Sequence, residues 1–169
     1  IGSKLGIAFP LHLTPLFPWS RDELKKRSRD SLLILGVPSW KNGEKLTLVT
    51  MRSHFGCEPK EREPCFYNQD WYLNEKFACE TVLESRWYLV RTSIEESSRG
   101  KNPSDIASSF RTREDFPPAI LIAFAFFAYY CMTDGELLWK NDFVWWADTD
   151  SNGDRIYTGR YRDPKGINK

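Results

Sequence analysis

The chain has 169 residues, of which 41% are hydrophobic and 28% charged, and its net charge is +1. This length and composition allow a conventional core and exclude global disorder and the collagen-like, coiled-coil and histone-like classes. The aromatic content of 15% is the distinctive feature, because aromatic side chains dominate both cores and recognition surfaces.

The four cysteines are too few for a small disulfide scaffold. Cys57 and Cys65 flank a Pro-bounded loop and could pair, whereas Cys131 lies in an apolar run and is expected to be buried. The sequence favours reduced thiols and leaves the compartment open, with the cytoplasm slightly favoured. No secretory signal is found in the chain, so an export signal would have to precede Ile1.

The N-terminal part is expected to be extended chain that lies over the core, followed by a short helix. Three prolines within residues 1–18 predict extended chain rather than regular helix. Ser20 and Glu23 have the spacing of a capping box, which predicts a short basic helix near residues 20–29. Residues 1–30 are therefore assigned to this segment and residues 31–169 to a single α+β domain.

Two β-rich runs follow, residues 31–37 and 45–51, and Asn42-Gly43 between them suits a tight turn, so a hairpin is predicted. Charge, proline and cysteine predict a surface loop over residues 52–70. Further along, the sequence predicts a short helix, a strand and an exposed linker, at residues 71–78, 86–93 and 97–103 respectively.

Residues 117–132 give the clearest helix signal. Tandem prolines suit its start, Thr133-Asp134-Gly135 suits its end, and the run between them is apolar on all sides. The apolar run Ala119–Met132 is shorter than the about 20 residues that cross a bilayer. We therefore expect a buried central helix and no membrane span.

The C-terminal part alternates aromatic or branched residues with polar ones over residues 136–140, 142–148 and 155–161. Ser151-Asn152-Gly153 divides the last two runs and predicts a second hairpin. Adjacent strand residues point to opposite faces, so Trp145 and Trp146 cannot both enter one core unless layers cover both faces. An outward indole near arginines suits a binding hot spot. The candidate ligand-binding residues are Trp139, Trp145, Trp146, Tyr157, Arg160 and Tyr161.

The string DTDSNGD at residues 148–154 resembles the first half of an EF-hand loop. Position 12 is Gly159 instead of glutamate and the flanks are predicted strands, which excludes an EF-hand. A looser calcium site at the hairpin tip stays open, with ligands Asp148, Asp150, Asn152 and Asp154. The same residues are common turn formers, so no cofactor is needed to explain them.

A zinc site and an active site have weaker support. His54, Cys57, Cys65 and Cys79 lack the two short ligand pairs of structural zinc sites. His12 and His54 lie in no nucleophile–base motif, and no Gly-rich phosphate loop follows a strand. The sequence thus favours non-catalytic recognition of a protein or glycan, and the charge balance disfavours nucleic acid. The alternatives are an enzyme with a pocket near the His54–Asp70 loop, and a self-associating structural protein.

The C-terminal half resembles a group of short, uncharacterised bacterial proteins that share the order W-L-V, helix, G-E-x-L and hairpin. The matching strings are WYLV, FPPAILIAFAFFAYY, GELLW and DSNGDRIYTGRY, beginning at residues 87, 116, 135 and 150. More distantly, the pattern is similar to C-type-lectin-like modules of formylglycine-generating-enzyme relatives and retroelement variable proteins. This resemblance implies a ligand-presenting scaffold. The sugar-binding tripeptides and the paired catalytic cysteines of those families are missing, so neither calcium-dependent sugar binding nor catalysis is implied.

Overall fold

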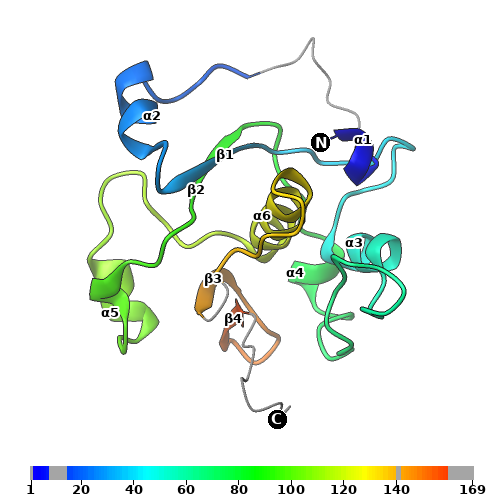
Figure 1. Ribbon diagram of the computed structural model, residues 1–169. Coiled ribbons are helices and arrows are strands. Elements are labelled where there is room, and N and C mark those ends of the chain that lie inside the picture. The colour runs from blue at the N-terminus through cyan, green and yellow to red at the C-terminus, as the bar shows by residue number, and fades with distance from the viewer. Residues whose placement is uncertain (1, 8–14, 140–141, 160–169) are drawn as a thin grey trace.

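Helix α6, Ala119–Met132, lies at the centre of the protein, and the other elements surround it (Figure 1). The computed structural model describes residues 2–7, 15–139 and 142–159 and has an α+β fold. Because α6 is apolar on all sides, it contributes the largest set of buried side chains, including Ile120 and Ala125 at 0% exposure. The predicted buried helix is confirmed. No helix in the described part of the chain has the length and apolarity to cross a membrane.

Shorter elements complete the core around α6. Helices α1 (Gly2–Leu5), α3 (Leu48–Phe55) and α4 (Lys76–Cys79) all contact it. Phe55 of α3 packs against Phe127 with ring centroids 4.2 Å apart. Cys131, near the end of α6, packs against this core but is only partly buried.

In the described part of the chain, four strands form two separate antiparallel pairs. Strand β1 (Ser31–Leu35) pairs with β2 (Trp87–Arg91), and β3 (Phe143–Thr149) pairs with β4 (Arg155–Gly159). The strand predicted at residues 86–93 and the terminal hairpin are confirmed. In Figure 1 the two sheets lie on different sides of α6.

The first predicted hairpin is wrong, because residues 48–55 form helix α3 instead of a strand. Thr47 and Thr50 make a reciprocal capping box, which starts a helix inside a β-branched run that otherwise favours a strand. The turn at Asn42-Gly43 is present, with Gly43 at a φ of 87° and an isolated bridge between Ser39 and Lys45. Strand β1 instead pairs with a partner more than 50 residues away in sequence.

The capping box at Ser20 is confirmed and starts α2, Arg21–Arg27. The Ser20 amide donates to Glu23 Oε2 at 2.7 Å, and the Glu23 amide donates to Ser20 Oγ at 3.2 Å. No residue of α2 is buried, as expected for a basic, solvated helix.

Some local expectations need correction. Helix α1 forms within the segment expected to be extended, before the first proline. Of the helix predicted at residues 71–78, only α4 is helical, and the linker at residues 97–103 contains the 3₁₀ turn η2 (Glu96–Ser98) and the start of α5 (Pro103–Ser108). Residues 136–139 form no strand, and Trp139 there has a φ of 43°.

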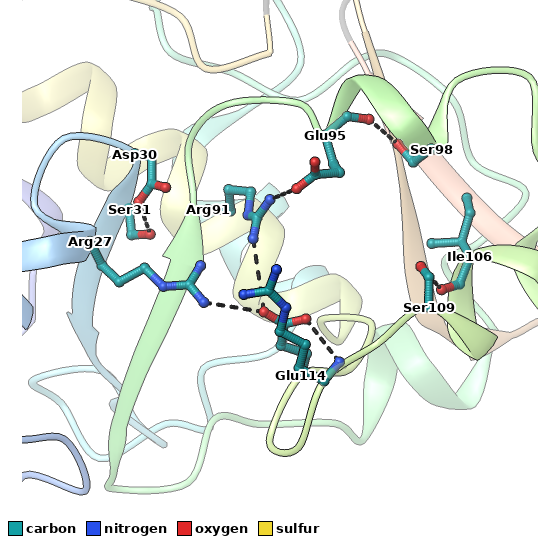
Figure 2. Close-up of polar contacts among 10 residues, drawn as sticks. Arg27, Asp30, Ser31, Arg91, Glu95, Ser98, Ile106, Ser109 and Glu114 are labelled. Carbon is teal, nitrogen blue, oxygen red and sulfur yellow. Dashed lines mark hydrogen bonds and ion pairs between the residues drawn. The ribbon is translucent and has the colours of Figure 1, made fainter. Parts of the chain in front are cut away.

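An ionic cluster around Glu114 ties α2 and β2 to the loop that leads into α6. Figure 2 shows the Glu114 carboxylate between the guanidinium groups of Arg27 and Arg91, with N–O distances of 3.3 and 3.8 Å. The amide of Arg111 also donates to Glu114 Oε2, at 3.0 Å. This amide first, and then Arg27 and Arg91, lower the pKa of Glu114 against the opposing effect of burial.

Candidate functional site: the terminal hairpin

The inner face of the β3–β4 hairpin packs on the core. Ile156 is buried, and Val144 and Trp146 are partly buried against the core residues. The Trp146 ring meets Phe77 edge-on, with centroids 5.9 Å apart. Its Nε1 is buried and has no hydrogen-bond partner in the described part of the chain. Trp146 therefore packs against the core from the inner side of the hairpin and is not an outward anchor.

The outer face carries three neighbouring rings, those of Phe143, Trp145 and Tyr157, which we call the aromatic face. Tyr157 lies opposite Trp145 in the strand register and meets its ring edge-on at 5.0 Å. The Phe143 ring also meets the Tyr157 ring edge-on, with centroids 5.5 Å apart. Phe143 and Tyr157 are each 55% exposed, and Trp145 is half-buried. The three neighbouring aromatic rings thus form one continuous surface, which is exposed mainly at Phe143 and Tyr157.

Gly159, opposite Phe143 in the register, makes room for this arrangement. A Cβ at Gly159 would lie 2.2 Å from the Asp142 carbonyl oxygen and 2.8 Å from Phe143 Cδ1, well inside van der Waals contact. A side chain there would push strand β3 or the Phe143 ring away. Glycine is therefore required at this position for the Phe143 ring and strand β3 to pack this close to β4.

The hairpin is anchored to the start of α6 by strand β3. A register shift between Trp145 and Thr149 frees the Ala147 amide from β4, and this amide donates to the Pro117 carbonyl at 2.9 Å. Asp148 Oδ2 accepts a hydrogen bond from the Ala119 amide at 2.6 Å. Pro118, the N-cap residue, makes no side-chain cap itself, so Asp148 caps α6 from another element. The aromatic face therefore rests on a rigid base.

The predicted calcium ligands have other roles in this structure. Asp148 caps α6, and Asp150 Oδ1 accepts the amides of Asn152 and Asp154, both at 2.9 Å. The Asp154 and Asn152 amides, with the Asn152 side chain, lower the pKa of Asp150. Ser151 donates to Glu75 at 3.0 Å and so links the tip to the N-cap of α4. In the described residues no three His, Cys, Asp or Glu side chains gather as a metal site.

The remaining candidate ligand-binding residues divide into two groups. Trp139 is 6% exposed and packs edge-on against Phe126 of α6 at 5.1 Å, so it belongs to the core and not to the surface. Arg160 and Tyr161 lie outside the described residues. Phe143 was missed at the sequence level, although its i, i+2 spacing from Trp145 places the two on the same face.

The loop proposed for the enzyme alternative does not build a pocket with His54. Asp70 is largely exposed and accepts from Arg52 at 2.5 Å, and Arg52 Nε donates to Cys57 Sγ at 2.8 Å. Cys57 has no disulfide, so the pairing with Cys65 is not formed. His54 lines a cavity together with Trp40 and Glu44. Among the described residues, none of residues 55–70 lines this cavity.

Comparisons with protein-family models, with curated proteins and with solved structures find no match for this chain.

Proposed function

We propose that the protein is a non-catalytic recognition module whose aromatic face binds an apolar surface of a partner protein. The observation that carries this proposal is the exposure of Phe143 and Tyr157 around Trp145 on the outer side of a hairpin. The inner side of the same hairpin already has its core partners. An exposed cluster of aromatic rings is a common form of binding hot spot.

The surroundings of the aromatic face favour a protein over a glycan. Sugar recognition needs unpaired hydrogen-bonding groups beside the stacking ring, because buried hydroxyl groups must find partners. Asp142, the polar residue next to Phe143, is already bound to Arg99 at 2.6 Å. Arg155 donates to the Trp146 carbonyl and lies over the Phe116 ring, with 4.6 Å from its Cζ to the centroid. Among the described residues, Ala147 and Gly159 beside the rings carry no polar side chain, and the polar groups of the aromatic face itself are the Tyr157 hydroxyl and the Trp145 indole N–H.

Rigidity is a second argument for the proposal. Binding costs less free energy when the contact residues are already ordered. The Ala147–Pro117 and Asp148–Ala119 hydrogen bonds fix strand β3 against α6. The ring-to-ring contacts hold the three side chains in one arrangement before any partner arrives.

The test compares three forms of the full chain on protein and glycan arrays. These are the wild type, the double variant Phe143→Ser/Tyr157→Ser, and Tyr67→Ser as a matched control. Tyr67 is also strongly exposed, at 71%, but lies in the loop far from the hairpin in sequence. We expect protein ligands that bind the wild type and Tyr67→Ser and lose at least about tenfold in affinity with the double variant, since central aromatic contacts contribute 2 kcal/mol or more.

Equal binding by all three forms would remove the aromatic face from recognition. If the wild type bound only glycans and the double variant lost this binding, the aromatic face would be the binding surface. Its assignment to protein partners would then be wrong. Binding of the chain to itself, lost in the same variant, would make the protein an assembly component.

A further inference from the structure

A second site lies away from the hairpin, at an open cavity of about 420 Å³ between residue 6, the turn at residues 40–44 and helix α3. Its volume lies in the range of small-molecule sites, and its open side leaves part of any ligand in contact with solvent. The cavity does not involve the aromatic face, so an inference drawn from it is independent of the function proposed above.

One wall of the cavity is aromatic and held in place. Trp40 is 7% exposed, and its indole N–H donates to Thr50 Oγ1 at 2.9 Å. The His54 imidazole lies against this indole, with centroids 4.6 Å apart and the rings tilted by 35°. Gly6 faces the same imidazole, and a Cβ at Gly6 would stand 3.5 Å from it. The wall is therefore a fixed indole with an exposed imidazole on it.

The surroundings of His54 disfavour the charged form of its imidazole, because they lower its pKa. Burial lowers the pKa of His54 and the nearby Arg62 guanidinium lowers it further. Arg62 itself donates to the His54 carbonyl at 2.9 Å and lies over the Phe55 ring. A neutral imidazole offers one donor and one acceptor and brings no charge to the cavity.

Opposite charges stand on the turn that forms the other wall. Lys41 and Glu44 are both exposed and line the cavity, and neither forms an ion pair with a residue that the structure describes. Backbone hydrogen bonds fix their turn, from Trp40 N to the Glu44 carbonyl at 2.8 Å and from Gly43 N to the Trp40 carbonyl at 3.0 Å. Asn42 Oδ1 also accepts the Glu44 amide at 3.0 Å. Within the described residues, one cation and one anion are thus without an ion-pair partner on this turn.

We propose that this cavity binds a small zwitterion of the amino-acid type. Lys41 receives its carboxylate, Glu44 receives its ammonium group, and its apolar side chain rests on the Trp40–His54 wall. A ligand with a single charge leaves either Lys41 or Glu44 without a counter-charge, so it gains less from the site.

The test is an NMR titration of the full chain, following the Trp40 indole N–H and the His54 imidazole signals. The probes are L-phenylalanine, phenethylamine, which lacks the carboxylate, and 3-phenylpropionate, which lacks the ammonium group. We expect saturable shifts with L-phenylalanine below about 10 mM and binding weaker by about tenfold for each singly charged analogue. The Trp71 indole signal, from a residue outside the cavity lining, serves as the internal reference.

Substitutions test whether Lys41 and Glu44 bind the two charged groups of the ligand. Lys41→Gln and Glu44→Gln should each weaken L-phenylalanine binding, whereas Lys45→Gln, an exposed lysine just beyond the turn and outside the lining, should not. Phe143→Ser/Tyr157→Ser should leave this binding intact, which separates it from the function of the aromatic face. No saturable shift with L-phenylalanine, or equal binding of phenethylamine and L-phenylalanine, would overturn the proposal.

Discussion

At the scale of single residues, Asp148 illustrates how one side chain can be misinterpreted from its neighbours in sequence. It begins a string that resembles a calcium loop, yet its carboxylate accepts the first amide of α6. Its role depends on Ala119, which lies 29 residues earlier in the chain. A helix that starts after proline has no capping side chain of its own, so an acid from another element can take this position.

Replacing Asp148 by alanine should lower the free energy of unfolding by about 1–2 kcal/mol, the usual value of a lost N-terminal cap. Urea unfolding followed by circular dichroism measures the change. Asp154→Ala is the control, because the Asp154 side chain is exposed and only its backbone joins the turn. A midpoint for Asp148→Ala equal to that of the control would mean that the cap contributes nothing.

Gly159→Ala should destabilise the hairpin, because the added methyl group would meet the Asp142 carbonyl and the Phe143 ring. We expect a loss of about 1–3 kcal/mol, as for other overpacked sites. Thr158→Ala, one residue away, controls for a change in strand propensity. Near-ultraviolet circular dichroism reports on the aromatic face directly, and an unchanged spectrum with unchanged stability would show that Phe143 adapts freely.

At the scale of elements, the terminal hairpin has one face for folding and one face available for binding. Trp146→Ala should cost about 2–4 kcal/mol, because it removes a large ring from the core edge. Trp145→Ala should cost about 1 kcal/mol or less, because its half-buried ring lies on the outer side and its removal leaves no cavity in the core. Thermal and urea unfolding of the two variants provide the comparison, and equal losses would contradict the assignment of opposite roles.

Trp146→Phe is a finer probe of the same element. The substitution keeps an aromatic ring against Phe77 and removes an indole N–H that has no partner in the described structure. An unpaired buried donor costs free energy, so this variant should lose much less stability than Trp146→Ala. A loss as large as that of the alanine variant would indicate that the N–H is paired in solution.

At the scale of the whole molecule, the Glu114 cluster connects α2, β2 and the loop before α6 (Figure 2). The pKa of Glu114 is lowered in the folded protein, so the folded state binds this proton less readily than the unfolded state. The resulting stabilisation is present at and above the ordinary pKa range of glutamate. It is lost as the pH falls through the lower, folded-state pKa.

Glu114→Gln should therefore unfold more readily than the wild type at neutral pH, and its stability should depend less on pH in the acid range. Urea midpoints measured from neutral to acid pH test this, with Glu61→Gln as an exposed control. The wild type and Glu114→Gln should converge at low pH, where Glu114 is protonated. Parallel curves would mean that the cluster does not couple protonation to folding.

The amino-acid sequence alone determined the elements that depend on near neighbours. The apolar run of α6, the capping box at Ser20 and the turn between β3 and β4 use residues a few positions apart, so their patterns are readable locally. The opposite orientations of Trp145 and Trp146 follow from the two-residue repeat of a strand. For the same reason Phe143 could have been assigned to the side of Trp145 from the sequence.

Only the tertiary structure decided which partners these elements have. Three contacts join residues that are distant in sequence and follow from no local pattern. They are the pairing of β1 with β2, the contact of Asp148 with α6 and the packing of Trp40 on His54. The run at residues 47–51 suits a strand or a helix locally, and the Thr47–Thr50 cap together with burial of Met51 selects the helix. The two-residue repeat of a strand places Trp145 and Trp146 on opposite sides but does not determine which side is buried. The packing of the hairpin on α6 decides this.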